Sequence, residues 1–414
     1  MRIFYGWWVV VGAFLNLFLT VGITFYGLPV FYPELVKNLG FSRSQVTEGI
    51  LLGFLIIAPF VGYIGSLIDR HGAQSVIRFG LAFVGGPLIL MGWTTRLWQY
   101  YLLSIAEVLG YILTGPIPNQ VLIAQWFRAA RGRAMGYAYL GLGVGGAVSP
   151  LFVHFLISHY GWRRAFEVVG ILILVVLFPI SQWVTRSAPA EMGLAPDGAE
   201  NPATDSAEAG AVFDLRRVAR STNFWLILFG STLVIGAIGT VIQQFVLFLQ
   251  DQKYTLGQAS VISSGLLFAG LAGRVIVGYL ADRFRKKNVM ATFYLVLAMA
   301  IPLLFFARYP AAAWTFAIVF GFAMGADYML IPLVTAECFG LATLGKLLAI
   351  IIMANSLGQW IGPWMAGMIF DATHSYNIAW TTVTVGGVLG AYLIYSINVN
   401  REKTARKAVG ATTA

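Results

Sequence analysis

Charged side chains are scarce in this chain. Aspartate, glutamate, lysine and arginine make up 11% of its 414 residues, whereas a soluble domain averages about 25%. Hydrophobic residues make up 58%, and the mean hydropathy is +0.78. This composition argues against a large water-soluble core and predicts a multi-pass protein of the cell membrane.

Sequence patterns for disulfides, metals and nucleotides are also missing. The single cysteine, Cys338, cannot form an intrachain disulfide. The four histidines, His71, His154, His159 and His374, show no metal-ligand spacing with cysteine or acidic residues. No glycine-rich phosphate-binding motif is present, and no polar segment is long enough for a catalytic domain. We therefore expect no metal, no cofactor and no enzymatic activity.

Long apolar runs dominate the chain instead. A helix of about 20 apolar residues crosses a bilayer. The runs predict an all-α integral membrane protein with twelve transmembrane helices in two pseudo-symmetric six-helix bundles. The expected helices lie near residues 7–31, 46–67, 75–95, 98–125, 134–158, 163–185, 223–249, 257–281, 288–307, 311–335, 343–369 and 378–398.

The two halves share a loop sequence, which indicates an internal repeat. Gly65-Ser-Leu-Ile-Asp69-Arg70 closes the second run of the first half, and Gly278-Tyr-Leu-Ala-Asp282-Arg283 closes the second run of the second half. Repeats in transporters place the substrate site near the membrane midplane at the repeat interface. We therefore expect four regions: an N-terminal bundle, a cytoplasmic linker, a C-terminal bundle and a cytoplasmic tail, at 1–186, 187–222, 223–400 and 401–414.

The basic residues predict the orientation of the chain. Its net charge is +10, but the lysines and arginines cluster in short loops, which is typical of topology determinants rather than of a nucleic-acid-binding protein. With the N-terminus inside, the inner segments hold 19 lysines and arginines and the outer segments hold 7. This bias predicts that both termini are cytoplasmic.

The paired G-x-L-x-D-R loops and the twelve runs resemble the major facilitator superfamily over nearly the whole chain. Tyr5-Gly-Trp-Trp8, the stretch 126–141 and Arg274 resemble its monocarboxylate-transporter branch, in a bacterial form. The resemblance implies alternating-access transport of a short monocarboxylate such as lactate or pyruvate, often with a proton. Animal members carry a lysine in the first helix and an aspartate at the position of Gly270. Both are missing here, so their scheme of proton coupling is not implied.

Arg274 lies within the eighth apolar run. A guanidinium at the centre of a bilayer costs roughly 2.5–3.5 kcal/mol on translocon-insertion scales, and arginine keeps its proton. A guanidinium can donate two parallel hydrogen bonds to a carboxylate. We therefore expect Arg274 to bind the substrate. The alternative is a structural ion pair with Asp327.

Asp327 and Glu107 are the acidic residues that we single out within the apolar runs, and either one could couple a proton to transport. Asp327 of the tenth run lies at a depth similar to that of Arg274. It could take up a proton when substrate occupies the arginine, or it could form a permanent salt bridge. Glu107 of the fourth run shares a helical face with Tyr111, Gly115 and Asn119. Glu107 is expected to act either as a proton relay or as a structural partner.

Other polar residues within the runs are weaker candidates for substrate contact. Each of them could instead bind a neighbouring helix, at roughly 0.6 kcal/mol per contact. These candidates are Asn119, Tyr328, Tyr26, Tyr139, Asn355 and Gln359.

The repeated loops and several glycines suggest moving parts. We expect Gly65, Asp69, Arg70, Gly278, Asp282 and Arg283 to form a gating motif at the inner end, where the aspartates pair with basic residues. Small residues let helices approach closely. We therefore expect close contacts at Gly141, Gly145, Gly358, Gly362 and Gly367.

These features predict a secondary transporter that moves a small organic anion with a proton through the lipid bilayer. No nucleic acid and no obligatory protein partner is expected. The first alternative is an organic-anion exchanger without proton coupling. The second is a non-transporting membrane sensor of the same anion, although the tail at 401–414 is short for signalling.

Overall fold

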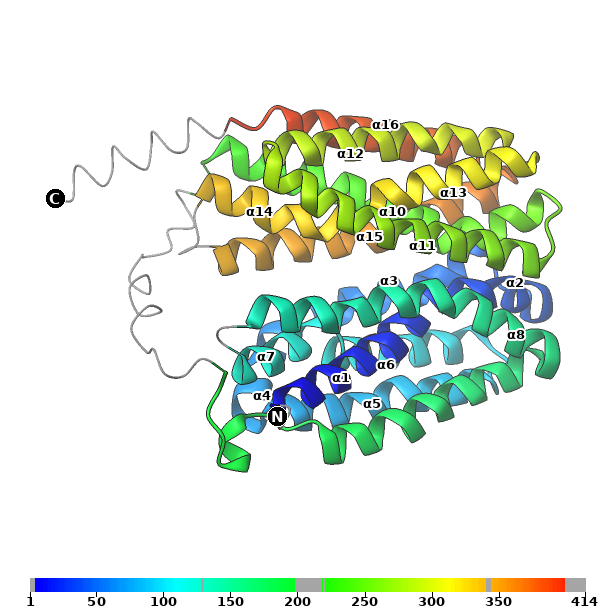
Figure 1. Ribbon diagram of the computed structural model, residues 1–414. Coiled ribbons are helices and arrows are strands. Elements are labelled where there is room, and N and C mark those ends of the chain that lie inside the picture. Colours follow the sequence, from blue (N-terminus) through cyan, green and yellow to red (C-terminus); the bar gives the residue numbers. More distant parts are fainter. Residues whose placement is uncertain (1–3, 128–129, 198–217, 219, 340–343, 399–414) are drawn as a thin grey trace. The chain divides into compact units, whose positions relative to one another are not determined.

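The chain folds almost entirely into helices, and within each of its two units these helices run back and forth (Figure 1). The computed structural model describes residues 4–127, 130–197, 218, 220–339 and 344–398. Within these residues, the only β-structure is an isolated bridge between Phe127 and Asp197. The predicted all-α class is confirmed. Positions 198–217 and 219 of the predicted linker and the predicted tail at 401–414 lie outside the described residues.

The first half of the chain makes six transmembrane passes. Glycine turns the chain between the fifth and sixth passes, because Gly161 has a φ of +78°, in the left-handed region. The helices are α1 (Gly6–Asn16), the π-helical η1 (Leu17–Gly27), α2 (Leu28–Leu39), α3 (Arg43–Ile57), η2 (Ala58–Phe60), α4 (Val61–His71), α5 (Ala73–Met91), α6 (Leu97–Thr114), α7 (Pro116–Trp126), α8 (Arg131–Pro179) and η3 (Ile180–Val184).

The second half makes six more passes after the short helix η4 (Pro189–Met192). Ten described helical stretches are long and apolar enough to cross a membrane. One of the ten stretches, Arg131–Val184, holds two passes, so the ten stretches contain eleven passes. The helices between Arg43 and His71 form one more pass, which gives the predicted twelve. The helices are α10 (Thr222–Asp251), α11 (Leu256–Arg283), α12 (Lys286–Ala300), η5 (Ile301–Phe306), α13 (Pro310–Met324), α14 (Asp327–Phe339), α15 (Leu344–Thr373) and α16 (Asn377–Tyr395).

The helices form two compact units that do not coincide with the two halves of the sequence. Unit 1 comprises Met1–Pro202 and Ile242–Phe268, and unit 2 comprises Ala203–Val241 and Ala269–Ala414. We call Ile242–Phe268 the crossing hairpin. It contains the end of α10, the turn after it and the start of α11, and it packs with the helices of the first half. The predicted limits of the linker remain a prediction.

Glycines bring the first and fifth passes together in unit 1. A Cβ atom on Gly22 would lie 2.7 Å from the carbonyl carbon of Gly145. Gly145 also lies against the backbone of Phe18, and Gly141 lies against the backbone of Phe14. The predicted close approach at Gly141 and Gly145 is confirmed.

The same pairing occurs between the seventh and eleventh passes in unit 2. A Cβ atom on Gly358 would lie 2.8 Å from the carbonyl oxygen of Thr232, and one on Gly362 would lie 2.8 Å from the carbonyl oxygen of Gly236. The seventh and eleventh passes correspond to the first and fifth in a six-pass repeat. The close contacts at Gly358 and Gly362 therefore confirm the expected packing and support the internal repeat.

Gly145→Ala is expected to lower the melting temperature of the purified protein. The added Cβ atom would overlap the Phe18 backbone, which cannot rotate away as a side chain could. Overpacking of this kind costs about 1–3 kcal/mol. Gly136→Ala is the matched control, because a Cβ atom there meets no neighbouring atom within 4 Å and alanine favours a helix by about 1 kcal/mol over glycine. Tryptophan fluorescence during heating would measure both variants, and equal melting temperatures would contradict this packing.

Candidate functional site

Two passes are broken at equivalent places in the two halves. In the fourth pass, α6 ends at Thr114 and α7 begins at Pro116, and Gly115 between them is extended, with φ −76° and ψ −151°. In the tenth pass, α13 ends at Met324 and α14 begins at Asp327. Broken helices in transporters leave backbone polar groups free near the substrate site. A substrate site is therefore expected around these two breaks.

Arg274 lies beside the break of the tenth pass. A Cβ atom on Gly325 would lie against the backbone nitrogen of Arg274, so α11 touches the turn that precedes Asp327. Arg274 is partly buried, whereas Asp327 is buried, with 7% of its surface exposed. Among the described residues, Arg274 forms no ion pair with Asp327 or with another acid. The structure therefore brings the predicted pair to one place without a salt bridge between them.

Asp327 begins a helix. It is the first residue of α14, and a negative charge is stabilised at a helix N-terminus. Tyr294 of α12 is buried and close enough for the Asp327 charge to act on its phenol. The Tyr294 hydroxyl has no hydrogen-bond partner within the described part of the chain. Tyr294 is thus a polar neighbour of the site that the sequence did not indicate.

Asn355 is fixed in one orientation in unit 2. Its Oδ1 accepts hydrogen bonds from the hydroxyls of Ser231 and Thr232, each at 2.9 Å. In this arrangement the Nδ2 amide group points away from both hydroxyls. Nδ2 is buried, and no residue that the structure describes accepts a hydrogen bond from it. Asn355 therefore holds a preoriented donor of the kind that a carboxylate accepts.

Two other candidates of unit 2 give less information. Gln359 is partly buried, and its backbone lies against Gly239 of α10. Tyr328 follows Asp327 in α14, but its side chain lies outside the described part of the structure. Their assignment to the substrate site remains a prediction.

Three phenols gather in unit 1. Tyr111 of α6 lies near Tyr26 of η1 and Tyr139 of α8. The Tyr139 hydroxyl accepts a hydrogen bond of 2.5 Å from Nε2 of Gln120. The structure thus brings the candidates Tyr26 and Tyr139 together around Tyr111, which lies one turn beyond Glu107 on the same helix.

Glu107 is the buried acid of unit 1. Its side chain is 3% exposed, and its Oε2 atom has no hydrogen-bond partner among the described residues. It lies within electrostatic range of the phenols of Tyr32 and Tyr100. The structure therefore offers the Glu107 carboxyl group no cationic partner within the chain it describes.

Asn119 caps the break of the fourth pass. Its Nδ2 donates hydrogen bonds of 2.7 Å to the carbonyl oxygens of Thr114 and Gly115. Asn16 donates a further bond of 2.6 Å to the Thr114 oxygen. Because both Asn119 N–H groups bind the backbone here, the geometry favours a structural role. Its assignment to the substrate remains a prediction.

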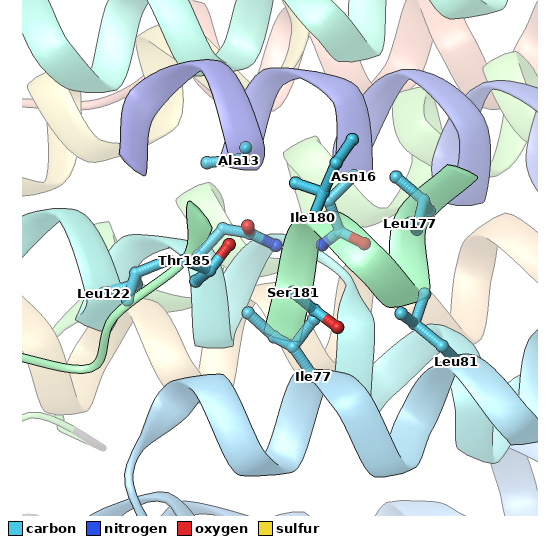
Figure 2. Close-up of a pocket in the computed structure, with 11 residues that line it drawn as sticks. Ala13, Asn16, Ile77, Leu81, Leu122, Leu177, Ile180, Ser181 and Thr185 are labelled. Atoms are coloured by element: carbon cyan, nitrogen blue, oxygen red, sulfur yellow. The ribbon is translucent and has the colours of Figure 1, made fainter. Parts of the chain in front are cut away.

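A small cavity with a mainly apolar lining lies beside these two asparagines. Its volume is about 10 Å³, which is near the lower limit for one water molecule. Asn16, Ser181 and Thr185 surround it (Figure 2). The Oδ1 atoms of Asn16 and Asn119 have no partner among the described residues. The cavity is too small for an organic substrate.

The loop motifs lie where the sequence placed them, at the ends of α4 and α11. Arg70 and Arg283 are exposed, and Arg283 stacks over the ring of Tyr279 at 4.3 Å. A Cβ atom on Gly278 would lie 3.8 Å from the Met329 side chain. The surroundings of Gly65 and the side chains of Asp69 and Asp282 are outside the described part of the structure. The gating role therefore remains a prediction.

Comparison with known proteins identifies the family. The sequence model of the Major Facilitator Superfamily matches residues 12–259 and 224–413. The chain is also similar in fold to the crystal structure of a bacterial homolog of the human lysosomal transporter Spinster, in an inward-facing and unoccupied conformation. That similarity has a TM-score of 0.75 and 16% sequence identity, and it covers 97% of this chain and 98% of the other.

Several characterised relatives are similar along most of their length. Monocarboxylate transporter 12 of Mus musculus is 24% identical, over 95% of this chain and 86% of its own. The membrane sensor protein UhpC of Escherichia coli (strain K12) is 24% identical, over 90% of this chain and 88% of its own length. The 4-hydroxybenzoate transporter PcaK of Acinetobacter baylyi is 21% identical, over 94% of this chain and 91% of its own length.

Asn119→Asp is expected to destabilise the protein more than Asn355→Asp. Both substitutions bury a carboxyl group. Asn119 donates both of its bonds, so an aspartate there loses one or both, and each buried group left unpaired costs about 1–3 kcal/mol. Asn355 accepts both of its bonds, and an aspartate would still accept them. Melting temperatures in detergent would test this order, and equal losses would count against the structural role of Asn119.

Proposed function

The chain belongs to the major facilitator superfamily, and from this premise we propose that it is a secondary active transporter of a small monocarboxylate such as lactate or pyruvate. The observation that carries the proposal is the position of Arg274. Arg274 lies in an apolar pass with its backbone beside a broken helix, and its guanidinium has no acidic partner among the described residues. An intramembrane arginine in such a place needs an anion.

The chemistry around Arg274 suits a carboxylate. A guanidinium donates two parallel hydrogen bonds, which match the two oxygens of a carboxylate group. Asn355 of the same unit adds an oriented amide donor. The remainder of α11 before Arg274 is apolar, as in Gly265-Leu-Leu-Phe-Ala269. A small organic anion with an apolar body is therefore favoured over an inorganic anion.

The similar proteins support an organic anion and keep two alternatives open. Two of their names contain a carboxylate, monocarboxylate and 4-hydroxybenzoate. An exchanger of organic anions would use Arg274 without a coupled proton. A membrane sensor is the third option, because UhpC carries that name. We rank transport first because intramembrane arginine and broken helices serve the movement of substrate.

We further propose that the anion moves with a proton by alternating access. A carboxylate at Arg274 would compete with Asp327 for the positive charge, and Asp327 could then accept a proton. One proton for each monocarboxylate leaves the transported charge at zero. Glu107 is the second candidate for the proton, because it is buried without a cationic partner in the described chain. In this scheme both termini are cytoplasmic and the repeated loops act as inner gates.

Arg274→Ala is expected to reduce uptake by about 100-fold or more, because removing one member of a buried charge pair costs about 2–5 kcal/mol. The measurement is uptake of radiolabelled lactate, pyruvate and other short carboxylates into proteoliposomes. Arg274→Lys keeps the charge but cannot form the two parallel hydrogen bonds of a guanidinium, so it should retain only part of the uptake activity. Arg308→Ala removes an exposed arginine and serves as the control. Normal flux in Arg274→Ala would exclude the assigned role.

Asp327→Asn is expected to abolish accumulation driven by a pH gradient while counterflow of labelled for unlabelled substrate continues. An amide cannot take up the coupled proton, although it leaves Arg274 able to bind the anion. A pH-sensitive dye inside the vesicles would report proton entry with the wild type. If proton-driven uptake survives in this variant, the coupling belongs to Glu107. If the wild type carries no protons, the protein is an exchanger.

A further inference from the structure

A short segment that follows the sixth pass is bound to unit 1. We call residues 186–197 the strap. The strap contains the short helix η4 and lies wholly within unit 1. Its middle, residues 190–195, is exposed, whereas Pro189 is buried. Contacts near its two ends therefore hold the strap in place.

Both ends of the strap bind Trp126, the last residue of α7. Nε1 of Trp126 donates a hydrogen bond of 2.7 Å to the carbonyl oxygen of Arg186. The carbonyl oxygen of Trp126 accepts a hydrogen bond of 3.1 Å from the backbone nitrogen of Asp197. Trp126 is fully buried, and the rings of Phe4 and Tyr5 pack against it, with centroids 6.0 and 5.5 Å away. The strap thus fastens the end of α7 through one side chain and one carbonyl group.

The carboxylate of Asp197 caps the next helix along the chain. The first N–H groups of a helix need acceptors from outside it. The residue before α8 is Ala130, which has no side-chain acceptor, and the first turn of α8 contains no acid. Oδ2 of Asp197 accepts a hydrogen bond of 2.8 Å from the backbone nitrogen of Ala130, and the helix dipole favours a negative charge there. Asp197 therefore binds the end of α7 through its N–H group and the start of α8 through its side chain.

α7 is the second half of the broken fourth pass, and it is held at both of its ends. At the break, Asn16 donates to the carbonyl oxygen of Thr114, and Asn119 of α7 donates to the same oxygen and to that of Gly115. At the other end, the strap holds Trp126. The break interrupts the hydrogen-bond ladder between α6 and α7, so α7 can shift without α6. Its position therefore depends on the attachments at its two ends.

We propose that Asp197 is a positioning residue for transport, which holds α7 in place from the strap. A shift of α7 would reach the candidate site, because Gln120 of α7 donates to the hydroxyl of Tyr139. Tyr139 is one of the candidates for substrate contact. The role of Asp197 in transport rests on the proposed function, whereas the attachment of α7 to the strap does not.

A separate contact holds the first end of the strap without α7. The backbone nitrogen of Gln74, in the first turn of α5, donates a hydrogen bond of 3.2 Å to the hydroxyl of Ser187. This bond joins the strap to the third pass. A variant that lacks the Asp197 carboxylate should therefore keep the strap attached at Ser187 while the end of α7 loosens. The effect of Asp197 can thus be separated from loss of the whole strap.

Hydrogen exchange in nanodiscs tests the attachment without any substrate. In Asp197→Ala, the amides of residues 126–134 should exchange about tenfold faster, because a hydrogen bond to a charged group is lost. Asp197→Asn keeps an oxygen that can accept from Ala130, so it should restore most of the protection. Glu191→Ala is the matched control, because it removes an exposed acid from the same strap. Its exchange at 126–134 should equal that of the wild type.

Uptake kinetics in proteoliposomes test the positioning role. Asp197→Ala should lower the maximal rate of carboxylate uptake about fivefold, as expected for the loss of one net hydrogen bond. The KM should stay the same, because Arg274, the proposed anion ligand, belongs to unit 2. A variant that is only less stable would yield less folded protein on gel filtration, with an unchanged rate for each folded molecule. Asp197→Asn should recover most of the rate.

Two results would overturn the inference: unchanged exchange at 126–134 in Asp197→Ala, or faster exchange there with an unchanged maximal rate. If Asp197→Ala does not fold, Trp126→Phe takes its place, because it removes the bond to Arg186 and keeps an aromatic ring. It is then compared with Glu191→Ala in both measurements. Failure of the proposed function looks different, because carboxylate flux would be absent in the wild type while the difference in exchange remained.

Discussion

The free energy of a polar group in the bilayer governs the arrangement of this protein. An ionisable side chain away from water needs a partner, or it must give up its charge. Arg274 cannot give up its charge, and among the described residues it has no acid bound to it. Glu107 can give up its charge and likewise has no cation. The two residues therefore call for different partners, an anion for the arginine and a proton for the glutamate.

The scaffold around these residues is built from close contacts between small residues. The first and fifth passes meet at Gly22 and Gly145, and the seventh and eleventh meet at Gly236 and Gly358. Apolar burial does not drive helices together inside lipid, so backbone approach and hydrogen bonds take its place. Such a scaffold also holds polar side chains in place through hydrogen bonds between helices, such as the two that Asn355 accepts from Ser231 and Thr232.

The sequence predicted the scaffold better than the site. Hydrophobic runs, loop charges and paired motifs depend on composition and order, so the twelve passes and the glycine contacts could be predicted. The direction of a side-chain hydrogen bond depends on how each helix is rotated. For this reason, the sequence could not show that Asn119 donates to the carbonyl oxygens of Thr114 and Gly115. Gly115-Pro116 did carry a signal for the break, because proline follows glycine inside a predicted helix. Nothing local in residues 242–268 indicated that this segment packs with the first half.

Glu107 and Asp327 lie on opposite sides of the breaks in their passes. Glu107 lies eight residues before Gly115, whereas Asp327 lies two residues after Gly325. At 1.5 Å per residue, Glu107 is about 12 Å from its break along the helix. Asp327 directly follows the turn that the Arg274 backbone touches. In the proposed function, this offset makes Asp327 the first candidate to respond to an anion at Arg274 and leaves Glu107 as the second candidate for the proton.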